Sequence, residues 1–181
     1  MLLNYNKISP KSLFFKEIER LYCHSFPVDE RRKLSDFEEI SASSTQFAVM
    51  GIFNGDKLIG FINYWDFHSF LYIEHFAIDP ECRNGGIGGR SLRNFLTGKQ
   101  LPVIIEVEPP CDELTRRRIA FYERMGFKLW NEIDYVQPPY DSDRNSLNLM
   151  LMTWQFEDVL QVNDAAETVK KNVYENSCWV K

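Results

Sequence analysis

The sequence has few cysteines and histidines, and they do not form the close groups that metal sites require. Its four cysteines, Cys23, Cys82, Cys111 and Cys178, lie far apart, no C-x-x-C pair occurs, and there are only three histidines. Zinc clusters need cysteine or histidine ligands at short, regular spacing. We therefore expect no metal site, and we expect the cysteines to be reduced thiols of a cytoplasmic protein.

Long apolar runs and an excess of positive charge are also missing. No apolar stretch approaches the roughly 20 residues of a membrane span, and the first residues lack the pattern of a secretory signal. The formal net charge is −5, which does not favour broad attraction to nucleic acid or anionic lipid. The expectation is a soluble, cytoplasmic monomer or homodimer with no nucleic-acid or membrane partner.

The sequence does contain enough apolar material for one folded domain. Its 181 residues are 44% hydrophobic and 14% aromatic, and they show no internal repeat, low-complexity tract or linker. A chain of this size and composition can bury one substantial core. We therefore expect a single domain over residues 1–181.

The spacing of apolar residues predicts an α/β order of elements. Helices are expected at about 13–22, 29–40, 87–97, 112–125 and 156–174, and strands at about 46–53, 57–67, 70–79, 103–108, 127–133 and 146–154. The turn Asn54-Gly55-Asp56 predicts a hairpin, Asp112 a helix cap, and Gly98 and Gly126 helix ends. This order favours a three-layer α/β unit.

The strand FLYIEHFAID, residues 70–79, is apolar on both alternating faces and is expected in the middle of the sheet. Strict alternation would place Tyr72, Glu74, Phe76 and Ile78 on one face and His75 on the other. An acid inside such a strand requires a hydrogen-bonding or ionic reason. Glu74 is therefore a candidate functional residue.

A glycine-rich loop, ECRNGGIGGRSL at residues 81–92, lies between this strand and the next expected helix. Free backbone N–H groups and the helix dipole at such a turn favour a phosphate ligand. The loop lacks the Lys-Ser/Thr of a nucleotide-binding P-loop and the spacing of a dinucleotide fingerprint. The glycines could also be turn formers only.

The loop matches R-x-x-G-x-G from Arg83 to Gly88, with EHFAIDPECR before it and RRIAFYERMGF after it. Together these segments resemble the GNAT superfamily of acyl-CoA-dependent N-acyltransferases, from about Gln46 to Trp154. The resemblance implies a three-layer fold with a mixed, mainly antiparallel sheet of six to seven strands. It also implies a splay between the strands at 70–79 and 103–108. Residues 155–181 would form a helical tail beyond the core at about 46–154.

The resemblance further implies that acetyl-CoA donates an acetyl group to a primary amine by direct transfer in a ternary complex. The backbone of Phe76, Ala77 and Ile78 would bind the pantetheine. Thr115 stands where many relatives carry a cofactor-binding Asn, and Tyr122 matches the family's general acid. The pyrophosphate would lie on the loop residues Arg83, Asn84, Gly85, Gly86, Ile87, Gly88 and Gly89. Arg116 to Arg118 could meet the adenosine 3′-phosphate or form a solvated helix face.

The base and the acceptor remain open in the sequence. Glu74 is the first candidate base, while Glu106 and Glu108 in the strand IIEVE could serve as base or bind a cationic amine; His75 is expected to be a buried, hydrogen-bonded histidine. The segments SFPVDERR and VQPPYDSDRN lie where family members build the acceptor pocket, for a small-molecule or peptide amine. Two alternatives are a non-catalytic acyl-CoA sensor and a glycine loop with only a structural role.

Overall fold

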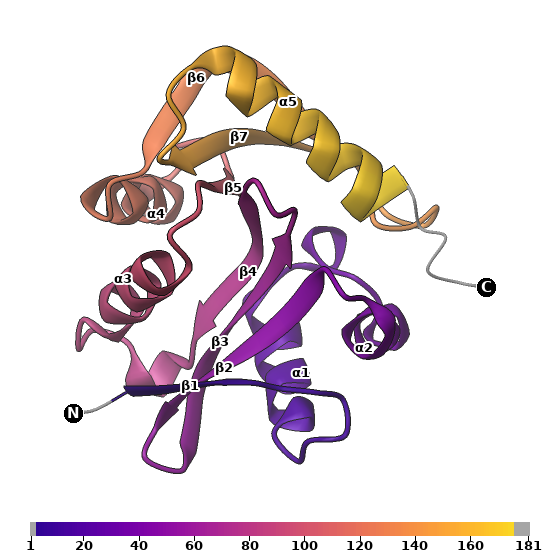
Figure 1. Cartoon of the computed structure of the whole chain (residues 1–181), viewed down its shortest axis with the longest axis vertical. Helices are drawn as coiled ribbons and strands as arrows, with labels where there is room; N and C mark the ends of the chain where they lie inside the picture. The colour runs from indigo at the N-terminus through magenta and orange to yellow at the C-terminus, as the bar shows by residue number, and fades with distance from the viewer. Residues whose placement is uncertain (1–2, 176–181) are drawn as a thin grey trace.

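The computed structural model describes residues 3–175 and shows an open sheet with helices on both faces (Figure 1). The strands are β1 (Leu3–Lys7), β2 (Phe47–Asn54), β3 (Lys57–Asp66), β4 (Leu71–Ile78), β5 (Val103–Val107), β6 (Lys128–Gln137) and β7 (Leu147–Trp154). The helices are α1 (Phe15–Ser25), α2 (Leu34–Ser43), α3 (Ile87–Lys99), α4 (Glu113–Arg124) and α5 (Val159–Val169), with short turns η1 (Val28–Glu30), η2 (Pro80–Cys82) and η3 (Lys170–Glu175).

The strands form one seven-stranded sheet in the order β1-β2-β3-β4-β5-β7-β6. All neighbours are antiparallel except β4 and β5, which are parallel. The expected mixed, mainly antiparallel sheet is confirmed. The strand β1 at the edge was not predicted, because its sequence LNYNK carries too few apolar residues to show an alternating pattern.

Two apolar clusters divide the core between the faces of the sheet. The helices α1, α2 and α5 supply side chains such as Phe15, Phe37 and Val162 to the first cluster. The helices α3 and α4 supply Phe95 and Ile119 to the second. The expected three layers are therefore present, and α5 packs on the domain through its buried face.

The strands β4 and β5 separate, as expected, partway along their length. The parallel pairing of β4 with β5 covers only Leu71 to Ile73 opposite Val103 to Ile105. Beyond Ile73 the two strands diverge (Figure 1), while β4 continues to Ile78 along β3. One edge of the second half of β4 is therefore not paired within the sheet.

The strand β4 also contains a bulge at Glu74. Its neighbours His75 and Ile73 pair with the consecutive residues Asn63 and Tyr64 of β3, so Glu74 has no partner opposite. Such a bulge places two consecutive side chains on the same face. The alternation predicted for this strand is therefore wrong: Tyr72, Glu74 and His75 face the layer of α1, whereas Phe76 and Ile78 face α3 and α4.

Other boundaries differ slightly from those predicted. The helix α3 continues through Gly98 and ends at Lys99, followed by Gln100 in the left-handed conformation with φ +56°, so Gly98 is not its end. The segment 29–40 divides into η1 and α2. The cap at Asp112 and the glycine end at Gly126, with φ +91°, are confirmed.

Candidate active site

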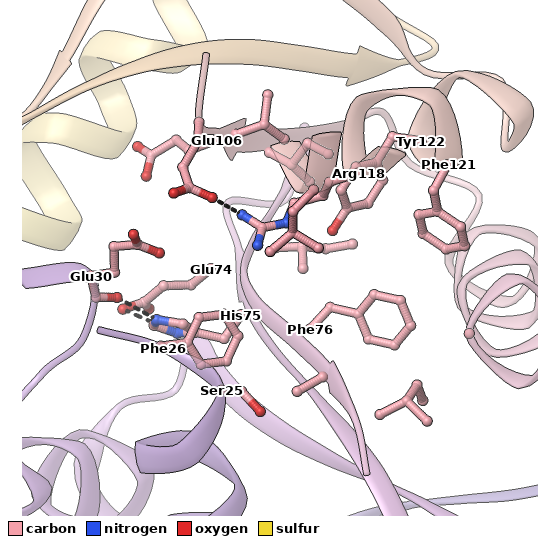
Figure 2. Close-up of a pocket in the computed structure, with 18 of the residues that line it drawn as sticks. Ser25, Phe26, Glu30, Glu74, His75, Phe76, Glu106, Arg118, Phe121 and Tyr122 are labelled. Carbon is pink, nitrogen blue, oxygen red and sulfur yellow. Dashed lines mark hydrogen bonds and ion pairs between the residues drawn. The ribbon is translucent and has the colours of Figure 1, made fainter. Parts of the chain in front are cut away.

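A cavity of about 670 Å³ occupies the space between the diverging strands. We call it the central cavity. Its lining comes from the second half of β4, the end of β5, the start of α3, the face of α4 and the loops around η1 and Tyr140. Figure 2 shows Glu74 and His75, Glu106, and Arg118 and Tyr122 around this space. The glycine loop lies at one end and a group of buried carboxylates at the other.

The glycine loop lines the central cavity and leads directly into a helix. Asn84 and Gly86 have left-handed φ angles of +68° and +70°, and the helix α3 starts immediately afterwards at Ile87. The first hydrogen bond of the helix runs from the Arg90 N–H to the Gly86 carbonyl at 3.1 Å. The N–H groups of residues 87–89 therefore have no acceptor within the helix, and they can bind an anion.

The loop is fixed against β4 by Arg83, whose Nε donates to the Ile78 carbonyl at 2.9 Å. The predicted loop residues Arg83, Asn84, Gly86, Ile87, Gly88 and Gly89 all line the central cavity, whereas Gly85 does not. The strand residues Phe76, Ala77 and Ile78 line it as well. An extended ligand beside the unpaired edge of β4 could therefore reach the loop with its far end.

Tyr122 lines the central cavity from α4, and its ring packs against Phe121 and Phe127. Within residues 3–175 its hydroxyl makes no hydrogen bond. Burial raises the pKa of Tyr122 to about 12, with a small opposing effect of Arg118. The phenol is therefore a neutral proton donor throughout the physiological pH range.

Glu74 is held by an ion pair beneath the cavity. Its Oε1 accepts from Arg32 Nε at 3.0 Å, and its Oε2 accepts from Trp65 Nε1 at 2.6 Å. Burial raises the pKa of Glu74, but Arg32, His75 and hydrogen bonds from Trp65 and Tyr140 together hold that pKa below its usual value. The carboxylate is ionised and already occupied by donors.

Glu106 has a different environment, made of tyrosine hydroxyls. Its Oε2 accepts from Tyr72 and Tyr174, each at 2.8 Å, and its Oε1 accepts from Tyr135. No lysine or arginine among the described residues forms an ion pair with it. Burial raises the pKa of Glu106 to about 7 against the opposing effect of the three hydroxyls. This carboxylate can therefore gain or lose a proton near neutral pH.

The remaining predicted site residues have partners that limit their roles. Glu108 forms an ion pair with Arg118, and both side chains line the central cavity. His75 Nε2 contacts the Glu30 carbonyl at 2.9 Å, and burial lowers the pKa of this imidazole, so His75 is neutral.

Thr115 does not line the central cavity. Its hydroxyl and N–H form a capping box with Asp112 at the start of α4. Nothing in this geometry supports the cofactor contact predicted for Thr115. Arg116 does not line the cavity either, and its Nη1 donates a hydrogen bond to the Pro110 carbonyl at 3.1 Å.

The two loops that the sequence singled out contact each other beside Glu74. The Arg32 guanidinium of SFPVDERR lies 4.9 Å from the centroid of Tyr140 in VQPPYDSDRN. Lys33 forms an ion pair with Asp141, and Asn145 Nδ2 donates to Asp29 at 2.9 Å. These contacts join residues far apart in the sequence, and each loop contributes a residue to the cavity lining, Glu30 from the first and Tyr140 from the second.

The individual roles of Arg32, Tyr135, Tyr140 and Tyr174 were not predicted from the sequence. Arg32 is one of two adjacent arginines in a polar segment, and nothing local distinguishes it from Arg31. The tyrosines resemble ordinary core residues. A buried acid such as Glu106 indicates that donors must exist, but it does not indicate which segments supply them.

The described part of the chain shows no metal cluster and no membrane span. Within residues 3–175, no group of three or more His, Cys, Asp or Glu side chains could hold a metal ion. Among the helices in the same range, none is long and apolar enough to cross a membrane. Cys23, Cys82 and Cys111 are free thiols and do not line the central cavity; Cys178 lies outside the described residues.

Known protein structures share the fold of this chain. The structure is similar to a protein assigned to the GNAT acetyltransferase family from Bacteroides thetaiotaomicron, at 38% identity and a TM-score of 0.90, covering 98% of this chain and 99% of that one. No curated protein sequence matches significantly.

More distant structures share the fold alone. One is a GNAT family acetyltransferase from Elizabethkingia anophelis with acetyl-CoA bound, at 14% identity and a TM-score of 0.58, covering 85% of this chain and 98% of that one. Another is the ribosomal-protein-S18-alanine N-acetyltransferase from Escherichia coli, at 16% identity and a TM-score of 0.57, covering 84% and 92%. The model of the acetyltransferase (GNAT) family matches residues 15–127, and the chain belongs to this family.

Proposed function

We propose that the protein transfers an acetyl group from acetyl-CoA to a primary amine by direct transfer in a ternary complex. One observation carries the proposal: a single cavity joins the glycine loop and the unpaired edge of β4 to the buried carboxylate Glu106. A donor with an anionic end and an extended arm fits the first part. An amine that must lose a proton fits the second.

The donor would lie along β4. Its pyrophosphate would accept hydrogen bonds from the N–H groups at the start of α3, and its pantetheine would pair with the backbone of Phe76 to Ile78. This arrangement directs the thioester toward Tyr122. Binding in one fixed geometry removes much of the entropic barrier to the bimolecular reaction.

The acid and base of the proposed reaction are Tyr122 and Glu106. An incoming ammonium group must lose a proton before it attacks the thioester carbonyl, and Glu106, with its pKa of about 7, can accept that proton directly or through water. The tetrahedral intermediate then expels the thiolate, which takes the proton of Tyr122. The attacking nitrogen still carries one proton more than the amide product, and this proton returns to the Tyr122 phenolate directly or through water. Burial disfavours a charged thiolate just as it disfavours a phenolate. It therefore raises the pKa of the CoA thiol as well as that of Tyr122, which keeps the two pKa values closer together.

Glu74, the first candidate from the sequence, is less suited to this role. Proton uptake at Glu74 would break its ion pair with Arg32 and leave a buried guanidinium without its counter-charge. We therefore assign Glu74 to the support of the acceptor wall. Because Cys23, Cys82 and Cys111 do not line the cavity, none of these cysteines is placed to form a covalent acyl-enzyme.

A paired substitution in α3 tests donor binding. Gly88→Asp adds a carboxylate at the proposed phosphate position, and its Cβ would meet only ordinary contacts at 3.8 Å. We expect calorimetry to show acetyl-CoA affinity weakened more than about tenfold, because like charges in such a site cost several kcal/mol. Gly98→Asp, at an exposed position of the same helix, should leave affinity unchanged. Equal affinity in both variants would contradict the proposed phosphate site.

Tyr122→Phe tests whether the protein turns over. We expect kcat to fall by about 100-fold while acetyl-CoA affinity is retained, because only proton donation is lost. Thiol release over a panel of amines, peptides and amino sugars measures the rate, and calorimetry measures the affinity. A non-catalytic acyl-CoA sensor, the alternative function, would bind acetyl-CoA but release no thiol with any amine.

A further inference from the structure

The segment η3, which follows α5, enters the polar network beside the central cavity. The Tyr174 side chain is 4% exposed, and its hydroxyl lies 2.7 Å from the Tyr72 hydroxyl and 2.8 Å from Glu106 Oε2. The preceding carbonyl, that of Val173, accepts from Arg32 Nη2 at 3.0 Å. Two consecutive residues of the tail are thus linked to the two carboxylates. Tyr174 contacts Glu106 directly, and Val173 contacts Arg32, the ion-pair partner of Glu74.

Hydroxyl groups dominate the surroundings of Glu106. The tyrosines come from β4, β6, the loop after β6 and η3, and the charge of Glu74 in β4 also raises the pKa of Glu106. Burial raises the pKa of each of these phenols, so all of them are neutral donors. The groups that face Glu106 are Tyr72, Glu74, Tyr135, Tyr140 and Tyr174.

Tyr174 does not line the central cavity, so it would act on the reaction through Glu106. We propose that Tyr174 is a positioning residue, whose hydroxyl fixes Glu106 Oε2 toward the acceptor and stabilises the ionised carboxylate. This inference rests on the proposed function, in which Glu106 takes the proton of the amine. It gives the C-terminal tail a part in the acyltransferase site.

The direction of the effect follows from the hydrogen bond. A hydroxyl that donates to a carboxylate favours its charged form and lowers its pKa. Removal of the Tyr174 hydroxyl should therefore raise the pKa of Glu106 above about 7. Tyr72 still donates to the same oxygen, so we expect an upward shift of about one pH unit.

Tyr174→Phe tests this role with two measurements. In the pH dependence of kcat/KM, the acid limb should move up by about one pH unit, lowering the rate about tenfold at pH 6 and little at pH 9. Carbon-13 NMR titration of labelled glutamate carboxyls, with Glu106→Gln for assignment, should show the same shift at Glu106. The NMR titration requires no acceptor.

Tyr64→Phe is the matched control. Tyr64 is a buried tyrosine whose hydroxyl accepts from Lys99 Nζ at 2.7 Å, and it does not line the cavity. Its substitution should leave both curves unchanged. An unchanged Glu106 titration in folded Tyr174→Phe overturns the role of Tyr174. If the wild-type protein transfers no acetyl group to any amine, the proposed function is contradicted instead. The NMR titration still decides in that case whether Tyr174 stabilises the ionised carboxylate.

Discussion

Glu106→Gln is expected to lower kcat by about 10²–10⁴-fold, the usual contribution of a general base. The amide retains the shape of the side chain and can still contact the tyrosine hydroxyls, but it cannot accept a proton from the ammonium. Acetyl-CoA affinity should not change, because the proposed donor site lies at the other end of the cavity. Steady-state rates at saturating acetyl-CoA and calorimetry measure the two effects separately.

Stability measurements distinguish loss of the base from loss of the fold. The folded protein raises the pKa of Glu106 from 4.5 to about 7, so it binds this proton more tightly than the unfolded chain. Its contribution to stability is therefore present below about pH 4.5 and is lost as the pH rises toward 7. Glu106→Gln removes this penalty, so we expect its melting temperature at pH 8 to exceed that of the wild type.

The controls for this variant are another buried acid and an exposed one. Glu132→Gln, at an exposed position of β6, should change neither rate nor stability. Glu74→Gln removes one charge of a buried pair and should mainly destabilise the fold. If Glu106→Gln retains full activity while folded Glu74→Gln loses it, the base is Glu74 and our assignment is wrong.

Arg32→Met should destabilise the fold more than any of the other single substitutions. It leaves Glu74 buried without a counter-charge and frees the Val173 carbonyl, and breaking a buried ion pair in this way costs about 3–5 kcal/mol. Urea unfolding at pH 8 measures the loss. Without Arg32, burial should raise the pKa of Glu74, so the deficit should shrink as the pH falls from 8 to 5.

Two further variants test the cause of this loss. Arg31→Met removes the neighbouring guanidinium, whose Nε donates to the Phe26 carbonyl at 3.2 Å, and should cost about 1 kcal/mol or less. The double variant Arg32→Met/Glu74→Met replaces the whole pair by apolar side chains and should recover most of the stability. Equal losses in the double and the single variant would show that the ion pair is not the cause.

The residues proposed to bind the donor could be singled out from the sequence because their signals are local. The glycine loop, the strand before it and the helix with Tyr122 each show a short pattern, and the structure brings them to one cavity. The splay was expected from the family resemblance that these segments carry. Backbone N–H groups need only a turn and a helix start to be exposed, and glycines indicate both.

The surroundings of Glu74 and Glu106 could not be predicted at the same depth because their contacts join distant segments. The bulge at Glu74 is invisible to an alternating pattern, yet it turns Glu74 toward Arg32 and away from the face of Phe76. The tail was predicted as a helix, but nothing in its sequence indicated that Tyr174 reaches Glu106. Tertiary packing decided these positions, not local propensity.

The ion pair and hydroxyl network have a consequence for how the protein acquires its site. The Arg32–Val173 contact joins residues 141 positions apart, and the Tyr72–Tyr174 contact joins residues 102 apart. Closing such long loops is entropically unfavourable, and contacts of this kind form late in folding. The hairpin of β2 and β3 needs only a short turn. During refolding, we therefore expect the glycine loop and its neighbouring strands to become ordered before the contacts around Glu74 and Glu106 form.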